Sequence, residues 1–203
     1  MKKNIAKAIS LIFNPLIMPS LGILMIFSSG SLFNLLPPEL KKIIFYSSLT
    51  ITFAIPLSVI IFFNINGKID YIYLNDIKKR RMPFFITFVF YGFSAFLFMK
   101  FKIIPRFIQL YMFAVALSVF LSLIITFRWK ISIHMVGIGG ITGLAIALLP
   151  YHPFYLDIWI ISLVFISGLI GYSRLKLDIH EPLQIYSGFL LGFITVAAIL
   201  FFI

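Results

Sequence analysis

Long apolar runs separated by short polar segments constrain this chain more than any other feature. Six runs can be delimited clearly, at residues 43–63, 84–99, 107–127, 135–149, 158–172 and 183–203. A helix needs about 20 apolar residues to cross the hydrocarbon core of a bilayer, and the longer runs meet that requirement. Because a helix satisfies its own backbone hydrogen bonds in lipid, we expect an all-α, polytopic transmembrane bundle that forms one domain over residues 1–203.

A further apolar run at residues 9–27 contains Asn14, Pro15 and Pro19. Proline removes a backbone donor and bends a helix, so this segment is expected to be kinked or re-entrant. No convincing small-residue cleavage site follows it, and we therefore expect it to be retained in the membrane. The count is then about seven spans, or six spans and a re-entrant first segment.

The amino-acid composition limits which reactions and partners are expected for this chain. Only 11% of the residues are charged, against about 25% in soluble domains, and there is no cysteine for disulfides or thiolate chemistry. The three histidines lack the spacing of a metal site, which favours a mechanism without metal or cofactor. The net charge of +11 suits anionic lipid headgroups, while its dispersal among loops makes nucleic acid an unexpected partner. We expect a multi-pass protein of a bacterial inner membrane.

Three polar clusters, at residues 75–83, 128–134 and 172–182, follow the second, fourth and sixth segments. An even number of crossings separates each pair, so all three are expected on one membrane face, with His152 in a loop on the other. Lys and Arg number 12 on the cluster face and five opposite, which favours a cytoplasmic site. A phosphate site would need the same cations, so this count does not decide which side of the membrane the clusters face. The sequence also leaves the oligomeric state open.

The third cluster contains Ser173 and Arg174, then His180 after five residues and Gln184 after three more. This pattern resembles the third motif of the type 2 phosphatidic acid phosphatase superfamily, in which Asp stands at the position of Gln184. Ser132 and His134, followed by Gly137, resemble the second motif, of which they retain the Ser and the His but not the Pro or the Gly. The first motif is matched loosely: with Pro83 aligned, Asn75 and Met82 stand at its Lys and Arg positions, and the cations at 78–81 fall out of register.

The resemblance implies metal-independent hydrolysis or transfer of a phosphoryl group on an anionic lipid, such as phosphatidic acid, a prenyl diphosphate or lipid A. His180 would be the nucleophile that forms a phosphohistidine, His134 the general acid, and Gln184 the partner that orients His180. A neutral imidazole near pH 7 suits the first role, and a second histidine can carry the proton. The substrate would be bound by Arg174, Ser132, Lys79, Arg80, Arg81 and Asn75.

Two features bear on this hypothesis. Pro182 suits the first turn of a helix, which would place His180, like His134, just before a helix start that favours an anion. Glutamine at position 184 can accept a hydrogen bond from histidine but offers no negative charge to a developing imidazolium. Losing a few kcal/mol of such stabilisation slows a reaction by orders of magnitude. On a helix, neither Asp178 nor Glu181 would share a face with His180.

Other interpretations remain open. The third cluster can be an interfacial loop with snorkelling cations, or the chain can be a non-catalytic lipid- or partner-binding protein on the same scaffold. Asn75 and Asp76 suggest a prenyltransferase, although a second Asp-rich motif for magnesium diphosphate is missing from the sequence. Gly139 and Gly143, four residues apart, predict close helix packing.

Overall fold

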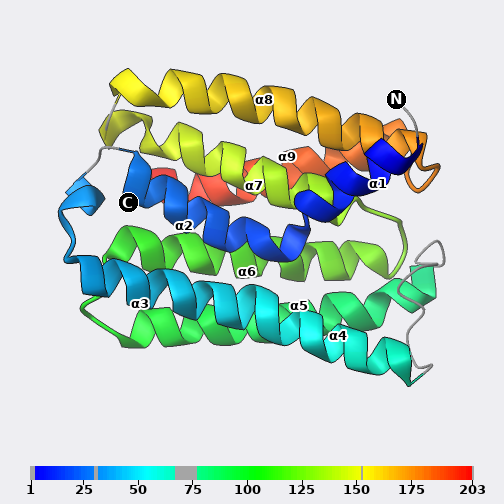
Figure 1. Ribbon diagram of the computed structural model, residues 1–203, viewed down its shortest axis with the longest axis horizontal. Helices are drawn as coiled ribbons and strands as arrows, with labels where there is room; N and C mark the ends of the chain where they lie inside the picture. The colour runs from blue at the N-terminus through cyan, green and yellow to red at the C-terminus, as the bar shows by residue number, and fades with distance from the viewer. Residues whose placement is uncertain (1–2, 30–31, 67–76, 152, 203) are drawn as a thin grey trace.

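The computed structural model describes residues 3–29, 32–66, 77–151 and 153–202, and these residues form a bundle of helices running nearly side by side (Figure 1). The α-helices are α1 (Lys3–Ile12), α2 (Met18–Ser28), α3 (Pro38–Leu49), α4 (Ile55–Ile65), α5 (Ile77–Lys100), α6 (Arg106–Thr126), α7 (Ile133–Leu148), α8 (Pro153–Lys176) and α9 (Pro182–Phe201). The shorter elements are η1 (Pro15–Ile17), η2 (Leu32–Leu35), η3 (Thr50–Ala54) and η4 (Leu149–Tyr151).

Seven segments of the described chain are long and apolar enough to cross a membrane, which confirms the predicted polytopic helical bundle. Several boundaries differ from those predicted, and the first span begins at Lys3 instead of residue 9. The second span begins at Pro38 instead of residue 43, and the sixth continues beyond residue 172 to Lys176. Arg174 therefore belongs to the last turn of a helix, where a cation interacts favourably with the helix dipole.

The first span is long enough to cross, from Lys3 to Ser28, but it is broken in the middle. The side chain of Asn14 accepts a hydrogen bond from Leu16 N, and Pro15 begins a short 3-10 turn, so α1 and α2 are separate helices. The Tyr91 hydroxyl of α5 donates to the carbonyls of Pro15 and Leu16 at 3.4 and 3.3 Å. Irregular backbone at membrane depth requires such partners within the protein, and here it receives them.

The second span carries a π-helical turn, η3, between α3 and α4. This turn packs against η1 and α5, so the irregular parts of the first two spans face one another. Ser20 of α2 and Ser48 of α3 bring their hydroxyls to 3.2 Å, which joins the two spans just beside these irregular turns. Two adjoining spans thus depart from regular helix at a similar depth in the bundle.

Glycines let α7 and α9 pack with their backbones in contact. A Cβ atom on Gly143 would lie 2.5 Å from the Phe193 carbonyl oxygen, and one on Gly188 would lie 2.7 Å from the Ser132 carbonyl oxygen. Gly139 is similarly closed off by the backbone of Phe189. The predicted close approach through Gly139 and Gly143 is thus confirmed, and it fixes the start of α7 against the start of α9.

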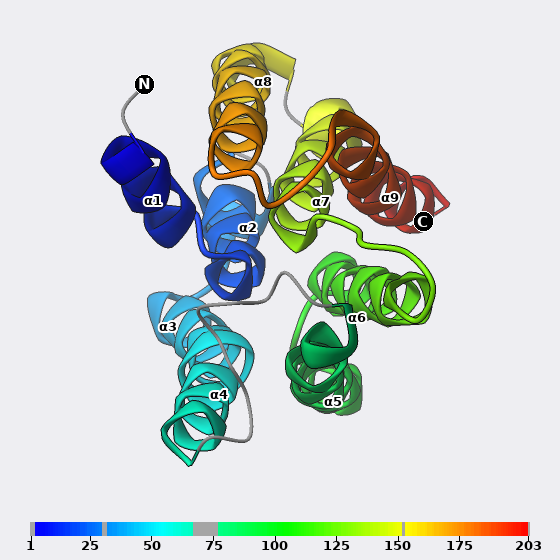
Figure 2. The same ribbon diagram turned by 90° about the vertical axis from the view of Figure 1, so that its right-hand side faces the viewer.

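The three polar clusters meet at one end of the bundle, which we call the site end. Figure 2 views the molecule from this end, where α5 begins, α6 leads into α7, and α8 leads into α9. Arg80 Nη1 donates to the Ile131 carbonyl at 3.1 Å, and Arg80 Nη2 lies 3.2 Å from His180 Nε2. These contacts confirm that the described parts of the three clusters share a face.

Candidate functional site

His180 is positioned by the turn that ends α8. Asp178 adopts a left-handed backbone with φ 54°, Asp178 N donates to the Leu175 carbonyl, and Ile179 N donates to the Arg174 carbonyl. These two bonds form the Schellman arrangement that commonly ends helices, with aspartate at the position where glycine is usual. The chain consequently reverses within a few residues and places His180 immediately before α9.

The hydrogen bonds of His180 define its tautomer. An arginine can only donate, so the 3.2 Å contact from Arg80 Nη2 makes His180 Nε2 an acceptor. Nδ1 then carries the proton and donates it to Gln184 Oε1 at 3.0 Å. The neutral imidazole is thus held at both nitrogens, and its lone pair points toward the guanidinium group of Arg80.

Positive charge surrounds this imidazole. Burial and the charge of Arg80 hold the pKa of His180 well below its usual range, Arg174 and Lys130 lower it further, and the hydrogen bond to Gln184 opposes the shift. Burial, followed by the charges of Arg80 and Arg174, also lowers the pKa of Lys130. The field at His180 favours a neutral ring, whose Nε2 lone pair accepts from Arg80, and it favours an anion placed beside that ring.

Neighbouring arginines have separate roles. Arg80 is 3% exposed and contacts His180, whereas Arg81 turns away: its Nη2 donates to the Phe127 carbonyl at 3.0 Å and its guanidinium lies 4.8 Å from the centre of the Phe127 ring. Phe127 ends α6, where a cation is favourable. Of these two arginines, the structure brings only Arg80 to the candidate site.

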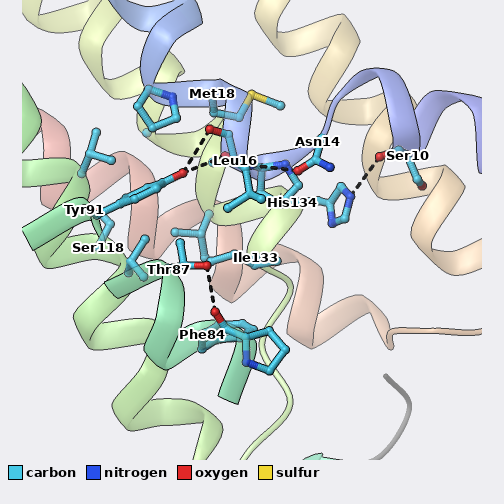
Figure 3. A pocket seen from close by; sticks show the side chains of 18 of the residues that line it. Ser10, Asn14, Leu16, Met18, Phe84, Thr87, Tyr91, Ser118, Ile133 and His134 are labelled. Atoms are coloured by element: carbon cyan, nitrogen blue, oxygen red, sulfur yellow. Dashed lines mark hydrogen bonds between the residues drawn. The ribbon is translucent and has the colours of Figure 1, made fainter. Parts of the chain in front are cut away.

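His134 lies in the first turn of α7 and points toward α1 (Figure 3). Its Nε2 donates to the Ser10 carbonyl at 3.1 Å, which leaves Nδ1 as a buried acceptor with no hydrogen-bond partner among the described residues. Arg174 Nη1 donates to the hydroxyl of the same serine at 3.3 Å. Ser10 therefore joins the second and third clusters to the first span.

Ser10 is the site residue that the sequence analysis missed. Its contact with His134 uses a backbone carbonyl, a group that every residue carries, so no side-chain motif marks it. The only available signal was the Asn-Pro pair at Asn14, which predicts an irregular first span.

The start of α9 corrects one expectation. Pro182 occupies the first turn as predicted, but Glu181 is the N-cap, and its side chain accepts from the backbone N–H of Gln184. Gln184 Oε1 in turn accepts from Glu181 N at 3.4 Å, which completes a capping box. Because the Glu181 carboxylate already occupies this helix terminus, α9 is not an open anion site, and one amide oxygen serves both the cap and His180.

The remaining predicted residues have different surroundings. Ser132 is the N-cap of α7; its hydroxyl is buried without a hydrogen-bond partner among the described residues, and its backbone N–H donates to the Gln184 carbonyl at 3.3 Å. Lys79 belongs to the first turn of α5, but its side chain lies outside the described part of the chain. Asn75, Asp76 and His152 also lie outside the described residues.

A cavity of about 720 Å³ begins at this cluster and runs into the bundle. Arg80, His134, Arg174 and Ser10 line its polar end, whereas most of its remaining walls are apolar side chains of α2, α5, α6 and α7. The cluster therefore presents the buried guanidinium groups of Arg80 and Arg174 and the ring of His134 to an internal space, whereas His180 lies behind Arg80 and is not among the lining residues. Such a site is suited to hold an anionic group that carries a hydrophobic part.

Comparison with protein-family models, with curated proteins and with solved structures finds no match to this chain.

Proposed function

We propose that this membrane protein is a metal-independent lipid phosphatase or phosphotransferase that works through a phosphohistidine on His180. The arrangement of His180 carries the proposal: a neutral ring is held through Nδ1 by Gln184, with Nε2 directed at Arg80 in a positive field. This is the protonation state and orientation that a nucleophilic histidine requires. The motif resemblance to type 2 phosphatidic acid phosphatases supports the same assignment.

In the first step, His180 Nε2 attacks phosphorus and the bond from phosphorus to the lipid oxygen breaks. His134 takes up a proton at Nδ1 when the phosphate anion binds beside it, and it gives that proton to the leaving oxygen. In the second step, water attacks the phosphohistidine, His134 takes a proton from the water, and phosphate leaves while His180 becomes neutral again. An acceptor hydroxyl in place of water would give phosphoryl transfer. The buried Nδ1 of His134, held ready by the Ser10 carbonyl, is the atom that takes and gives the proton.

Arg80 and Arg174 would hold the phosphoryl oxygens as negative charge develops on them. A bound phosphate would replace the lone pair of His180 as a partner of Arg80 Nη2, which frees Nε2 for attack. Phosphatidic acid, prenyl diphosphates and lipid A are the substrate types that follow from the resemblance. A bacterial inner membrane is the location we propose for this reaction.

The test is phosphate release by purified protein from a panel of lipid phosphates and diphosphates in EDTA. We expect turnover without metal and a loss of about 10⁴-fold or more in His180→Ala, since the nucleophile is removed. His134→Ala is expected to slow the hydrolysis of phosphatidic acid more than that of a diphosphate. The phosphate that leaves a diphosphate is a better leaving group than a lipid alkoxide and needs less protonation. Release that persists in His180→Ala, or that EDTA abolishes, would refute the mechanism.

A second candidate is a protein that binds a lipid phosphate without cleaving it. The neutral amide of Gln184 favours this alternative, because it stabilises an imidazolium less than a carboxylate would. Gln184→Asp separates the two candidates. If the protein is an enzyme, restoring the charge should raise its turnover by about 10- to 100-fold, which corresponds to roughly 1.4–2.7 kcal/mol. A binding protein should release no phosphate before the change.

A further inference from the structure

The inner part of the cavity is closed by the broken first span. Leu16 and Met18 of this span line it together with Thr87 and Tyr91 of α5 and Ser118 of α6 (Figure 3). Gly137 of α7 also lines it, and a Cβ atom there would lie 2.9 Å from Met18 Cγ. The broken first span therefore forms part of the wall of this space.

The walls of this inner part offer little to a polar ligand. Thr87 and Ser118 donate to carbonyls in their own helices, at 2.8 and 2.9 Å. Tyr91 and Tyr111 donate to carbonyls of the broken span. Each of these four hydroxyls thus has its donor engaged, and the surface between them is hydrocarbon. Such a wall suits an aliphatic chain.

The cavity has the depth of one leaflet. Along α5 it extends from Arg80 to Tyr91, and eleven residues of helix rise about 16 Å. The hydrocarbon core of a bilayer is about 30 Å thick, so this distance reaches roughly its middle. The polar end lies at the membrane edge, where a headgroup belongs.

The outer end joins the cavity to the surroundings of the bundle. Lys7 and Leu11 of α1 line it, and Leu11 is 71% exposed. A lipid that approaches from the side would pass α1 with its headgroup near Lys7 and the arginines. From its opening inward, the cavity presents first cations and then apolar walls. This is the order of the headgroup and the hydrocarbon chain in a lipid.

We propose that this cavity binds the hydrocarbon chain of the lipid phosphate inside the protein, with the phosphate at Arg80 and Arg174 and the chain against Leu16, Tyr91 and Ser118. The inference rests on the proposed function for its headgroup site, and it specifies the substrate as a lipid whose chain leaves the bilayer to react. Because the space lies inside the helices, it selects for the shape of the chain as well as for the phosphate.

The experiment uses a long-chain alkylphosphonate with a diazirine near the chain end, added to the full-length protein in nanodiscs. A phosphonate has no P–O–C bond to hydrolyse, so labelling does not depend on turnover. We expect light-induced labelling at residues that line the cavity, namely Thr87 and Tyr91 on α5 and Tyr111, Val115, Ser118 and Val119 on α6. Excess hexadecylphosphonate should abolish it on the wild-type protein, whereas hexadecanol, which lacks the headgroup, should not.

Ser118→Trp fills the cavity and should lower this labelling by about tenfold or more, the ratio that roughly 1.4 kcal/mol of steric conflict produces. Ile124→Trp adds similar bulk to α6 at a position 49% exposed and should leave labelling unchanged. Labelling confined to outward residues such as Phe113 and Ile124, or labelling that hexadecylphosphonate does not displace, would overturn the proposal. Labelled cavity residues in a protein that releases no phosphate would preserve it and refute the catalytic function.

Discussion

The two sides of the bundle are built by opposite means. On one side, α7 and α9 pack through glycines with backbone against backbone, which leaves no room for a methyl group at Gly139, Gly143 or Gly192. On the other side, the first two spans are irregular and a cavity of about 720 Å³ lies between them and α5. The close-packed side supplies His134, His180 and Gln184, and the irregular side supplies Arg80 and Ser10.

This difference assigns separate tasks to the two sides. Groups that must keep their mutual geometry to within a few tenths of an ångström are best carried by elements that have no freedom to move. Space for a ligand, by contrast, requires helices that do not pack closely. The site lies where the rigid pair and the irregular spans meet, and substitutions on either side are expected to have different consequences.

The largest expected effect tests the rigid side. Gly192→Ala would force a methyl group against the backbone of α7, where a Cβ atom would lie 2.9 Å from Gly140 N, and should destabilise the protein by more than about 3 kcal/mol. Gly168→Ala in α8 meets nothing within 4 Å and should cause no loss. Thermal unfolding in detergent, followed by tryptophan fluorescence, measures both. Equal melting temperatures for the two variants would contradict the close-packed interface.

The next effect distinguishes the two arginines on α5. Arg80→Gln removes the cation that contacts His180 and should lower phosphate release by about 10²–10³-fold. Arg81→Gln removes a bond to the end of α6 and should change release by less than about threefold. Arg80→Gln should also raise the pKa of His180 toward its usual value, which NMR of labelled histidine can follow. Equal losses of phosphate release in the two variants would contradict the separate roles of Arg80 and Arg81.

A smaller effect concerns pH. The pKa of His180 is lowered in the folded protein, so below about pH 6.5 the unfolded chain binds a proton that the folded protein does not. Stability should therefore fall as the solution becomes more acidic, by about 1.4 kcal/mol per pH unit for this one group. His180→Gln should remove that part of the slope. The predicted pH dependence is contradicted if acidification from pH 6.5 to 5.5 stabilises the wild type relative to His180→Gln.

The smallest effect tests the contact between α1 and the turn after α8. Lys3 Nζ lies 3.7 Å from Asp178 Oδ2, and both side chains are largely exposed. Lys3→Ala should change the free energy of unfolding by less than about 0.5 kcal/mol, because water and salt screen such pairs. Ser10→Pro, which would distort the carbonyl bonded to His134, should matter more than this variant to phosphate release.

Much of the fold followed from hydropathy. The apolar runs predicted about seven spans, or six and a re-entrant segment, because lipid leaves the backbone few alternatives, and the prolines near Asn14 predicted a kinked or re-entrant first span. The π-helical turn at Thr50–Ala54 was not predicted, because one extra residue in a helical turn leaves no mark on an apolar sequence. The extension of α8 to Lys176 was missed because charged residues were taken to end the helix.

The candidate site was only partly predictable. The motif resemblance implied that Gln184 orients His180, and the two side chains are in hydrogen-bond contact although His180 precedes the helix. The choice between Arg80 and Arg81 depends on the rotation of α5 about its axis, which tertiary packing determines. Ser10 acts partly through its backbone, and the Glu181 cap competes with an anion for the helix terminus, so neither follows from motif spacing.

The shared oxygen of Gln184 has a consequence for biogenesis. The same atom closes the first turn of α9 and receives the proton of His180, so the imidazole is oriented only once that helix has formed. Since α9 follows the other described spans in the chain, Arg80, Ser10 and His134 enter the membrane before the imidazole of His180 can be oriented. Packing of α9 against α7 is thus the step that completes the site, and a chain that stalls before this step would lack an oriented His180.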